Sequence, residues 1–241
     1  MPQAYTKEQM AEAIATLREQ IAEAAQLSGR QKQDIMLCAV CKTRSSDTVR
    51  ISAQLDVDLF GENHMQELVM HSQDGAYLGK KAHFIGHLQT NKVKKVVGLA
   101  EIIQSVDSLR LLEAIDNEAK KQSIIQDIMF EINIGAEPSK SGLLADALMP
   151  LLDTAAAMNN IRIRGLMAIP PASASQKESR MYFCQMRELY EKLQAQNLPN
   201  MQADILSMGM SGSFYDAILE GANLVRVGTA IYGQRDYTNK L

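Results

Sequence analysis

The sequence predicts an α/β protein: a single (β/α)8 barrel of the TIM type with an extra N-terminal helix. Eight apolar runs of strand length recur along the 241 residues, and stretches with helical spacing or helix-forming composition separate them. Uninterrupted alternation of strands and helices is typical of a parallel sheet. Eight such units in a chain of this length fit a closed barrel better than an open sheet. Because no linker or low-complexity segment divides the sequence, we expect residues 1–241 to form one domain.

The N-terminal segment has the pattern of an amphipathic helix that precedes the first strand. Thr6 and Gln9 have the spacing of a capping box at a helix start. The apolar residues that follow at helical spacing are Met10, Ile14, Leu17, Ile21 and Leu27. Gly29 comes just after this pattern, where glycine commonly ends a helix. We therefore expect one helix outside the eight repeated units.

Eight strands are expected from the apolar runs. They cover residues 35–41, 58–61, 82–86, 101–106, 128–134, 161–168, 205–208 and 224–227. The first run contains no alternating polar residue, which indicates a strand that is buried on both faces. Barrels of this class place their functional side chains at the C-terminal ends of the strands. The polar residues that follow each run are therefore the candidates for a functional site.

Composition and charge exclude several classes of protein. A net charge of −3 gives no general attraction to nucleic acid or acidic membranes, and no apolar run has the length of a membrane span. The basic run at residues 92–95 lacks the interleaved aromatic residues on which bases stack. We therefore expect neither a nucleic-acid partner nor a membrane segment. The N-terminus also lacks the apolar core of a signal peptide, so a cytoplasmic protein is expected.

The cysteines and histidines do not form a metal-binding pattern. Cys38 and Cys41 have Cys-x-x-Cys spacing, but within a strand this spacing directs their side chains to opposite faces. Reduced cysteines in the core are therefore expected. His83 and His87 flank a predicted strand, and no carboxylate or cysteine pattern completes a metal site around them. We expect no bound metal.

Two loops rich in glycine and hydroxyl groups follow the seventh and eighth strands. Residues 207–213 read Ser-Met-Gly-Met-Ser-Gly-Ser, and residues 226–230 read Arg-Val-Gly-Thr-Ala. Glycine allows a backbone to approach an anion closely, and free amides at a helix start bind phosphate. Each loop alone would be interpreted as an ordinary turn with a serine cap. Their position at adjacent strand ends, where such barrels often hold phosphate, predicts a phosphate site.

Lys42 and Arg226 are charged residues at the edge of apolar strands or inside them. Lys42 ends the first apolar strand, and its stem either extends to the surface or places the amine in an apolar site. Burial lowers the pKa of a lysine, and a neutral amine can attack an aldehyde to form a Schiff base. Arg226 lies inside the last apolar strand. It needs an acceptor there, which is a neighbouring carboxylate or carbonyl, or a ligand.

A lysine that faces a phosphate site suits two chemistries. One is an aldolase that acts on a phosphosugar, and the other is pyridoxal 5'-phosphate (PLP) held on the lysine. The spacing of the residues does not separate the two. Lys140 is the rival Schiff-base lysine, but it lies in a polar loop that favours a charged amine in contact with an anion. The residues therefore favour Lys42 and leave the chemistry open.

Eight segments, in one order along the chain, resemble the pyridoxal 5'-phosphate homeostasis protein family, whose members are relatives of the N-terminal barrel of bacterial alanine racemase. These segments are residues 39–43, 60–67, 83–92, 105–108, 133–142, 165–168, 206–211 and 225–233. The resemblance extends from about Ile35 to Tyr237. No single segment is specific enough to carry it, but their shared order is highly specific.

The resemblance implies which residues bind the cofactor PLP. They are Lys42, Asn63, Met167, Ser211, Arg226, Gly228 and Thr229. Among them, Lys42 would form the Schiff base and Arg226 would face the pyridine nitrogen. The three residues of the last two loops would bind the phosphate, and the remaining two would line the ring.

The resemblance also implies a function in intracellular PLP homeostasis and amino-acid balance, without a robust catalytic activity. Alanine racemases carry a second domain that supplies a catalytic tyrosine, and this sequence ends at Leu241, just after the eighth strand and its helix. We therefore expect a monomer that takes up and releases PLP, with PLP-dependent apoenzymes as transient recipients. A racemase-like enzyme of weak activity is the alternative, followed by a Schiff-base aldolase.

Overall fold

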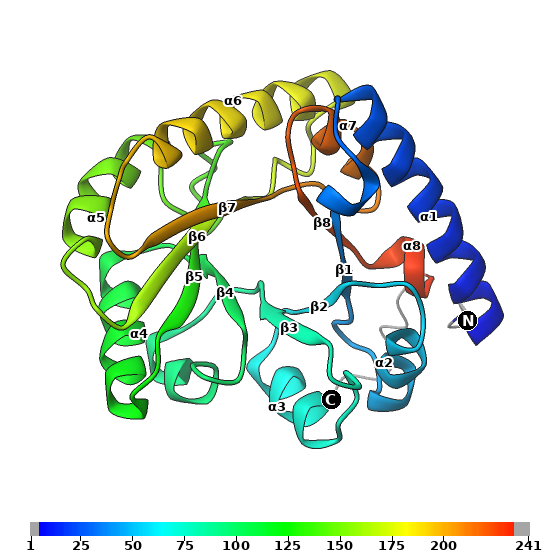
Figure 1. Ribbon diagram of the computed structural model, residues 1–241, viewed down its shortest axis with the longest axis horizontal. Helices are drawn as coiled ribbons and strands as arrows, with labels where there is room; N and C mark the ends of the chain where they lie inside the picture. The colour runs from blue at the N-terminus through cyan, green and yellow to red at the C-terminus, as the bar shows by residue number, and fades with distance from the viewer. Residues whose placement is uncertain (1–4, 234–241) are drawn as a thin grey trace.

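The predicted parallel barrel is confirmed by the computed structural model, which describes residues 5–233. Its strands are β1 (Met36–Val40), β2 (Leu59–Glu62), β3 (Lys81–Phe84), β4 (Ile102–Val106), β5 (Gln126–Ile132), β6 (Ile161–Ala168), β7 (Met201–Ser207) and β8 (Leu224–Val227). Each strand pairs in parallel with the next, and β8 pairs with β1, so the sheet closes into a ring (Figure 1). The far end of the family resemblance, at Tyr237, lies outside the described residues.

Helices surround the ring of strands. The α-helices are α1 (Lys7–Leu27), α2 (Ser46–Ala53), α3 (Met65–Gln73), α4 (Leu109–Gln122), α5 (Leu148–Ala155), α6 (Gln176–Gln194), α7 (Phe214–Leu219) and α8 (Thr229–Tyr232). The 3₁₀ helices are η1 (Lys32–Asp34), η2 (Thr90–Lys95) and η3 (Ala145–Ala147). The helix expected after the third strand is thus the short 3₁₀ helix η2. Within residues 5–233, no helix combines the length and the apolar character needed to cross a membrane.

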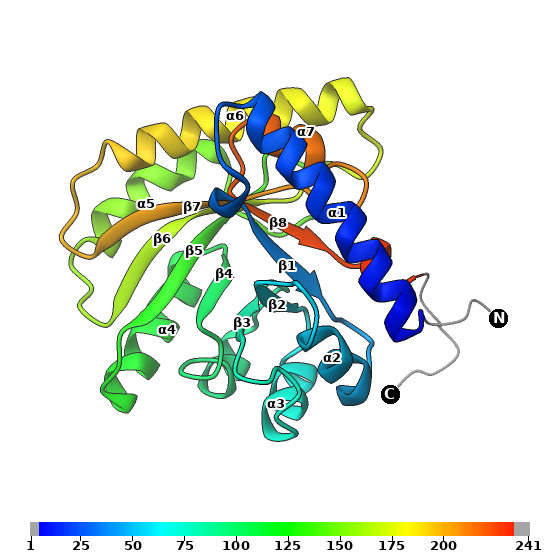
Figure 2. The same ribbon diagram turned by 45° about the vertical axis from the view of Figure 1, so that its right-hand side comes forward.

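The extra N-terminal helix α1 lies outside the ring, beside α7 and α8 (Figure 1 and Figure 2). The predicted capping box is present, because Thr6 Oγ1 accepts from the N–H of Gln9 and Gln9 Oε1 accepts from the N–H of Thr6. The helix ends at Leu27, and Gly29 follows with a φ of +73°. The predicted apolar face of α1 is buried against the barrel layer, apart from Leu27, which is exposed.

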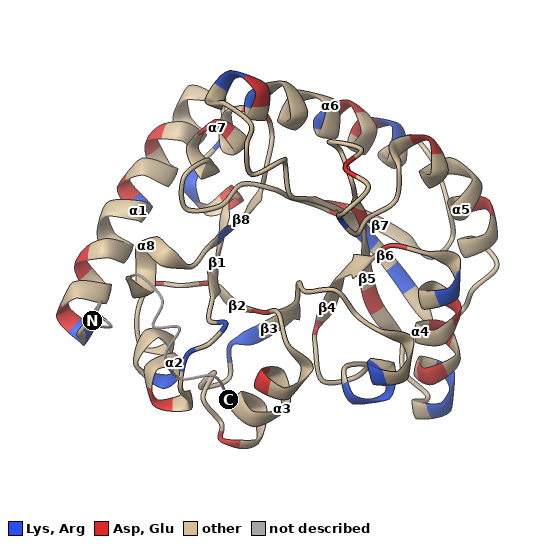
Figure 3. Cartoon of the chain, turned by 180° about the vertical axis from the view of Figure 1, so that it is seen from behind, with Lys and Arg blue, Asp and Glu red and all other residues tan. Residues whose placement is uncertain are grey.

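Three strands begin earlier than their apolar runs predicted: β3 by one residue, and β5 and β7 by more, before residues 128 and 205. The differences at β5 and β7 have a clear cause. The added positions carry paired charges. Asp127 on β5 accepts hydrogen bonds from Arg162 at 2.7 Å and from Arg164 at 2.6 Å, both on β6. Arg164 also pairs with Asp204 on β7 at 2.7 Å. Figure 3 shows basic and acidic positions on these neighbouring strands. Because polar side chains start the strands, hydrophobicity alone placed their beginnings too late.

Apolar side chains form one core inside the barrel and a larger one between the barrel and its helices. The inner core consists of Cys38, Leu59, Ile102, Met129, Met167, Ile205 and Leu224. Cys41 belongs to the outer core. The two cysteines therefore lie on opposite sides of the barrel wall, as predicted, and both are buried free thiols.

Candidate functional site

Lys42 lies just beyond the end of β1, at the C-terminal edge of the barrel, and is half-buried. It lines a small hollow with residues of the neighbouring β8 loop. The residues of this hollow are Val40, Lys42, Arg44, Gly228, Thr229 and Tyr232. In the β1–β8 pair Ala39 lies opposite Val227, so the two strands deliver their following loops to the same place. The structure thus brings Lys42, Gly228 and Thr229 together.

Ser211, on the loop after β7, reaches the β8 loop. Its Oγ accepts hydrogen bonds from the backbone N–H groups of Gly228 and Ala230, each at 3.4 Å. A Cβ added to Gly228 would lie 3.2 Å from the carbonyl oxygen of Val40, so a larger residue would push the β8 loop away from β1. The two loops are thus joined beside Lys42 by a hydroxyl group and two backbone amides, which are the kinds of group that hold a phosphate.

Arg226 is buried inside the barrel wall on β8, with 3% of its surface exposed. Its guanidinium donates to Ser207 Oγ and, at 2.9 Å, to the carbonyl oxygen of Ala168. Burial lowers the pKa of Arg226 to about 10, so the group stays protonated at neutral pH. The acceptor that a buried arginine requires is thus supplied by a hydroxyl and a carbonyl.

A chain of hydrogen bonds continues from Ser207 across the barrel interior. Ser207 Oγ donates to Gln104 Oε1 at 2.7 Å, and Gln104 Nε2 donates to His83 Nδ1 at 2.8 Å. Burial lowers the pKa of His83 to about 3, so its ring is neutral and Nδ1 accepts. Because arginine only donates, Arg226 fixes the direction of every bond in the chain. Sequence reasoning missed this chain of hydrogen bonds, although its members are polar residues inside predicted apolar strands.

The two candidates for the ring face lie in different surroundings. Met167 on β6 is fully buried in the inner core, next to Ala168, whose carbonyl oxygen binds Arg226. Asn63 follows β2 and lines a second hollow. The Oδ1 atom of Asn63 is buried and has no hydrogen-bond partner among the described residues. The structure therefore places Met167 near Arg226 and Asn63 in a hollow different from that of Lys42.

The second hollow also contains the rival lysine. It is lined by Asn63, Ile85, Gly86, His87, Glu131, Ile132, Asn133, Lys140, Ser141 and Ile169. Lys140 pairs with Glu137 at 2.5 Å and donates to the carbonyl oxygen of Pro170 at 3.2 Å. These contacts tie the Lys140 side chain to its own loop and to the loop after β6. Burial raises the pKa of Glu131 to about 7, and sequence reasoning missed this carboxyl group.

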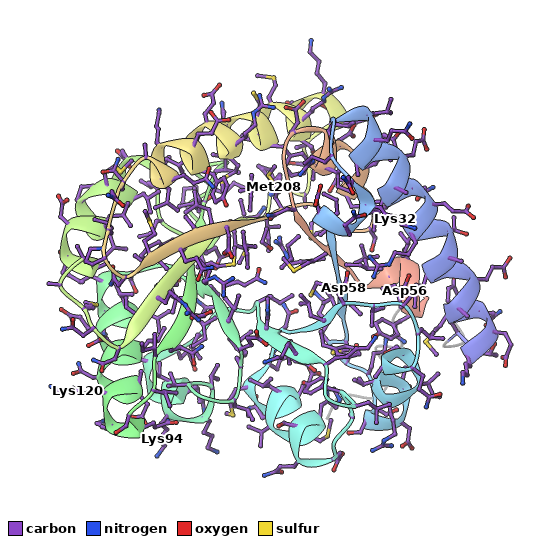
Figure 4. The ribbon with its side chains drawn as sticks, in the orientation of Figure 1. Lys32, Asp56, Asp58, Lys94, Lys120 and Met208 are labelled. Atoms are coloured by element: carbon purple, nitrogen blue, oxygen red, sulfur yellow. The ribbon has the colours of Figure 1, made fainter. Side chains whose placement is uncertain are left out.

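The basic run at residues 92–95 lies on η2, outside the two hollows described above. Lys92 lines a third hollow together with Asn63. Figure 4 shows Lys94 on η2 and Lys120 on α4 at the periphery of the molecule. Both side chains are exposed. These lysines therefore lie on a solvated face of the molecule.

Comparisons with known proteins bear on the family and the fold of the chain. The family model of the alanine racemase N-terminal domain matches residues 13–236. The pyridoxal phosphate homeostasis protein of Aquifex aeolicus is 36% identical over 226 residues, which cover 94% of this chain and 98% of that protein. The protein of the same name from Pseudomonas aeruginosa is 36% identical over 228 residues, which cover 95% and 96%. The PLP-bound structure of PipY from Synechococcus elongatus has a TM-score of 0.81 and 30% identity, covering 93% of this chain and 100% of PipY.

The closed barrel and the matched family model define a barrel of the alanine racemase N-terminal type. The 36% identity to relatives that are matched over nearly their full length assigns the chain to a narrower family within this class. It belongs to the family of pyridoxal phosphate homeostasis proteins, and the predicted family is thereby confirmed.

Proposed function

We propose that this protein binds PLP as a Schiff base on Lys42 and serves intracellular PLP homeostasis and amino-acid balance. The observation that carries the proposal is that Lys42 lines one hollow with Gly228 and Thr229, beside the hydroxyl of Ser211. An amine and a set of phosphate donors at adjacent strand ends match the two functional ends of PLP. The PLP-bound structure of PipY, a relative with 30% identity, supports the same cofactor.

The residues around Lys42 fit this cofactor. The phosphate would be held by Ser211, Gly228 and Thr229, and the absence of a side chain at Gly228 lets the β8 loop lie close to Val40 of β1, beside Lys42. Arg226 would donate to the pyridine nitrogen. The proposed lining of the ring is Asn63 and Met167. The buried Oδ1 of Asn63, without a partner in the described part of the chain, supports this because a ligand donor would satisfy it.

The charge of Arg226 supports a carrier over an enzyme of high turnover. PLP supplies an aldehyde and a pyridine ring that withdraws electrons most strongly when its nitrogen is protonated. Arg226 is protonated at neutral pH and has no lone pair with which to accept a proton. As a donor opposite the ring nitrogen, it would keep that nitrogen unprotonated and so weaken the ring as an electron sink.

We further propose a cytoplasmic monomer, a single domain over residues 1–241, that releases PLP to PLP-dependent apoenzymes. The matched alanine racemase domain favours one second candidate, a racemase-like enzyme of weak activity. A Schiff-base aldolase would need the same lysine and phosphate donors, but the named relatives give it no support.

Absorbance titration with PLP tests the binding proposal. The wild-type protein and Lys140→Ala are expected to turn yellow as the Schiff base forms, whereas Lys42→Ala is expected to lose the visible band. A band that survives in Lys42→Ala and disappears in Lys140→Ala would assign the Schiff base to Lys140. A wild-type protein that takes up no PLP would refute the proposal.

An assay of D- and L-alanine interconversion separates the carrier from the racemase. The PLP-loaded protein is expected to show no sustained turnover above that of free PLP. Sustained turnover that Lys42→Ala abolishes would establish the racemase candidate instead.

A further inference from the structure

Lys42 occupies a tight turn with an unusual backbone, here named the Lys42 turn (residues 41–44). The N–H of Arg44 donates to the carbonyl oxygen of Cys41 at 3.0 Å, so Lys42 and Thr43 are the two central residues. Thr43 has a φ of +64°, in the left-handed region that a β-branched residue rarely adopts. Turns with a left-handed third residue usually place glycine there. The strain must therefore be held by contacts from outside the turn.

Glu67 on α3 holds the strained residue directly. The backbone N–H of Thr43 donates to Glu67 Oε1 at 2.8 Å. Glu67 is only 7% exposed, and its Oε2 is buried without a hydrogen-bond partner among the described residues. Burial raises the pKa of this carboxyl group, which shows that its surroundings disfavour the charge. Burial of the Glu67 carboxyl group costs free energy, and its hydrogen bond to the strained Thr43 amide offsets part of that cost. The carboxyl group is therefore suited to fixing the backbone at Thr43.

A second side chain of α3 holds the far end of the Lys42 turn. The fully buried His71 has Nε2 3.0 Å from the carbonyl oxygen of Arg44 and Nδ1 2.6 Å from Glu62 Oε1. A carbonyl oxygen and a carboxylate oxygen both accept, so both ring nitrogens lie where they can donate. Burial alone would lower the pKa of His71, but the hydrogen bond and the charge of Glu62 raise it.

The near end of the turn is tied to the same carboxylate. Cys41 Sγ donates to Glu62 Oε1 at 2.9 Å, and the Cys41 N–H donates to the carbonyl oxygen of Gly61 at 3.2 Å. Contacts from β2 and α3 thus reach the turn on both sides of Lys42. The segment 60–67, which carried part of the family resemblance, supplies two of the three side chains involved, Glu62 and Glu67.

Cys41, Glu62 and His71 also have the donor types of a metal site, with ligand atoms within 4.8 Å of one another. However, Glu62 Oε1 accepts from Cys41, His71 and Tyr77 at 2.9, 2.6 and 2.9 Å. These are hydrogen-bond distances, whereas ligands around one tetrahedral zinc ion lie about 3.3 Å apart or more. The cluster is therefore better explained as hydrogen-bonded support for the turn.

We propose that Glu67, together with His71, is a positioning residue that fixes the Lys42 turn so that the Lys42 amine meets an aldehyde held by the phosphate loops. This inference rests on the proposed function of Lys42. Glu67 acts through the backbone amide of Thr43 and does not contact the ligand itself. Its loss should therefore impair bond formation at Lys42 and leave recognition of the phosphate intact.

Two ligands separate these effects: PLP, and pyridoxine 5'-phosphate, which carries an alcohol in place of the aldehyde and forms no Schiff base. Glu67→Met keeps the side-chain length and removes the acceptor. We expect it to weaken PLP binding about tenfold, the effect of losing one hydrogen bond. Binding of pyridoxine 5'-phosphate should change less than about twofold. Glu67→Gln is the matched control, because its amide oxygen still accepts from Thr43, and it should bind both ligands as the wild type does.

Two results would overturn the inference: unchanged PLP binding by Glu67→Met, or an equal loss of both ligands, which indicates general damage to the fold. If Glu67→Met folds poorly, Thr43→Gly combined with it provides a second test. Glycine adopts the left-handed conformation without support, so this double variant should regain PLP binding, and failure to regain it also counts against the inference. Failure of the proposed function would differ, because the wild-type protein itself would form no Schiff base with PLP.

Discussion

Arg226 donates a hydrogen bond to Ser207 inside the barrel, and Ser207 in turn donates to Gln104 on the opposite part of the wall. Both acceptors of the guanidinium, the Ser207 hydroxyl and the Ala168 carbonyl, are neutral groups. A buried cation is thus oriented by dipoles, and its charge remains available to an acceptor on a ligand. This is the arrangement that the proposed contact to the pyridine nitrogen requires.

Removal of the Ser207 hydroxyl should destabilise the fold. Ser207→Ala removes the buried acceptor of Arg226 Nη1 and the buried donor to Gln104 Oε1, so we expect a loss of about 1–3 kcal/mol in the free energy of unfolding, measured by urea denaturation. Ser105 is the matched control: it is also fully buried, and its hydroxyl has no partner within the described part of the chain. Equal losses in Ser207→Ala and Ser105→Ala would contradict the importance of the chain.

The phosphate loops should recognise PLP through its phosphate. Ser211→Ala removes the hydroxyl beside the Gly228 and Ala230 amides, and its Kd for PLP is expected to rise about tenfold, or about 1.4 kcal/mol. Binding of pyridoxal, which lacks the phosphate, should not change. Ser213→Ala serves as the control, because that hydroxyl accepts from Met210 within its own loop. An equal loss for PLP and pyridoxal would place Ser211 outside the phosphate site.

Glu131 should make stability depend on pH. Burial, aided by the charge of Asp107, raises its pKa from 4.5 to about 7. The protonated carboxyl therefore stabilises the fold, and this contribution is complete below pH 4.5 and is lost as the pH rises through about 7. Glu131→Gln stays neutral, so above this range it should exceed the wild type in stability, by at most about 3 kcal/mol. Thermal unfolding across this pH range measures the effect, and parallel profiles of the two proteins would contradict it.

The barrel was predictable because its signal is repeated. Eight apolar runs and the helices between them point to the same architecture, so an error in one unit does not change the fold. The starts of β5 and β7 were missed because Asp127 and Asp204 look like loop residues until their partner Arg164 is placed between them. Partners on adjacent strands are distant in sequence, and local hydrophobicity carries no information about them.

The part of the candidate site that follows the strand ends could be predicted from the sequence. Lys42, Gly228 and Thr229 follow β1 and β8 directly, and parallel pairing of these strands brings them together. Glu67 and its bond to Thr43 were not predictable, because a glutamate on a short helix usually faces solvent. Its burial depends on where α3 packs against the turn after β1, which is a property of the folded chain.

The central claim is that Lys42 forms the covalent bond to PLP, and reduction of the loaded protein tests it most directly. Borohydride delivers hydride to the carbon–nitrogen double bond of a Schiff base and converts it into a stable single bond, which peptide mapping by mass spectrometry then locates. We predict a phosphopyridoxyl group on the peptide that contains Lys42, with Lys140 unmodified. Modification of Lys140 in place of Lys42, or a protein without any label after loading and reduction, would contradict the account.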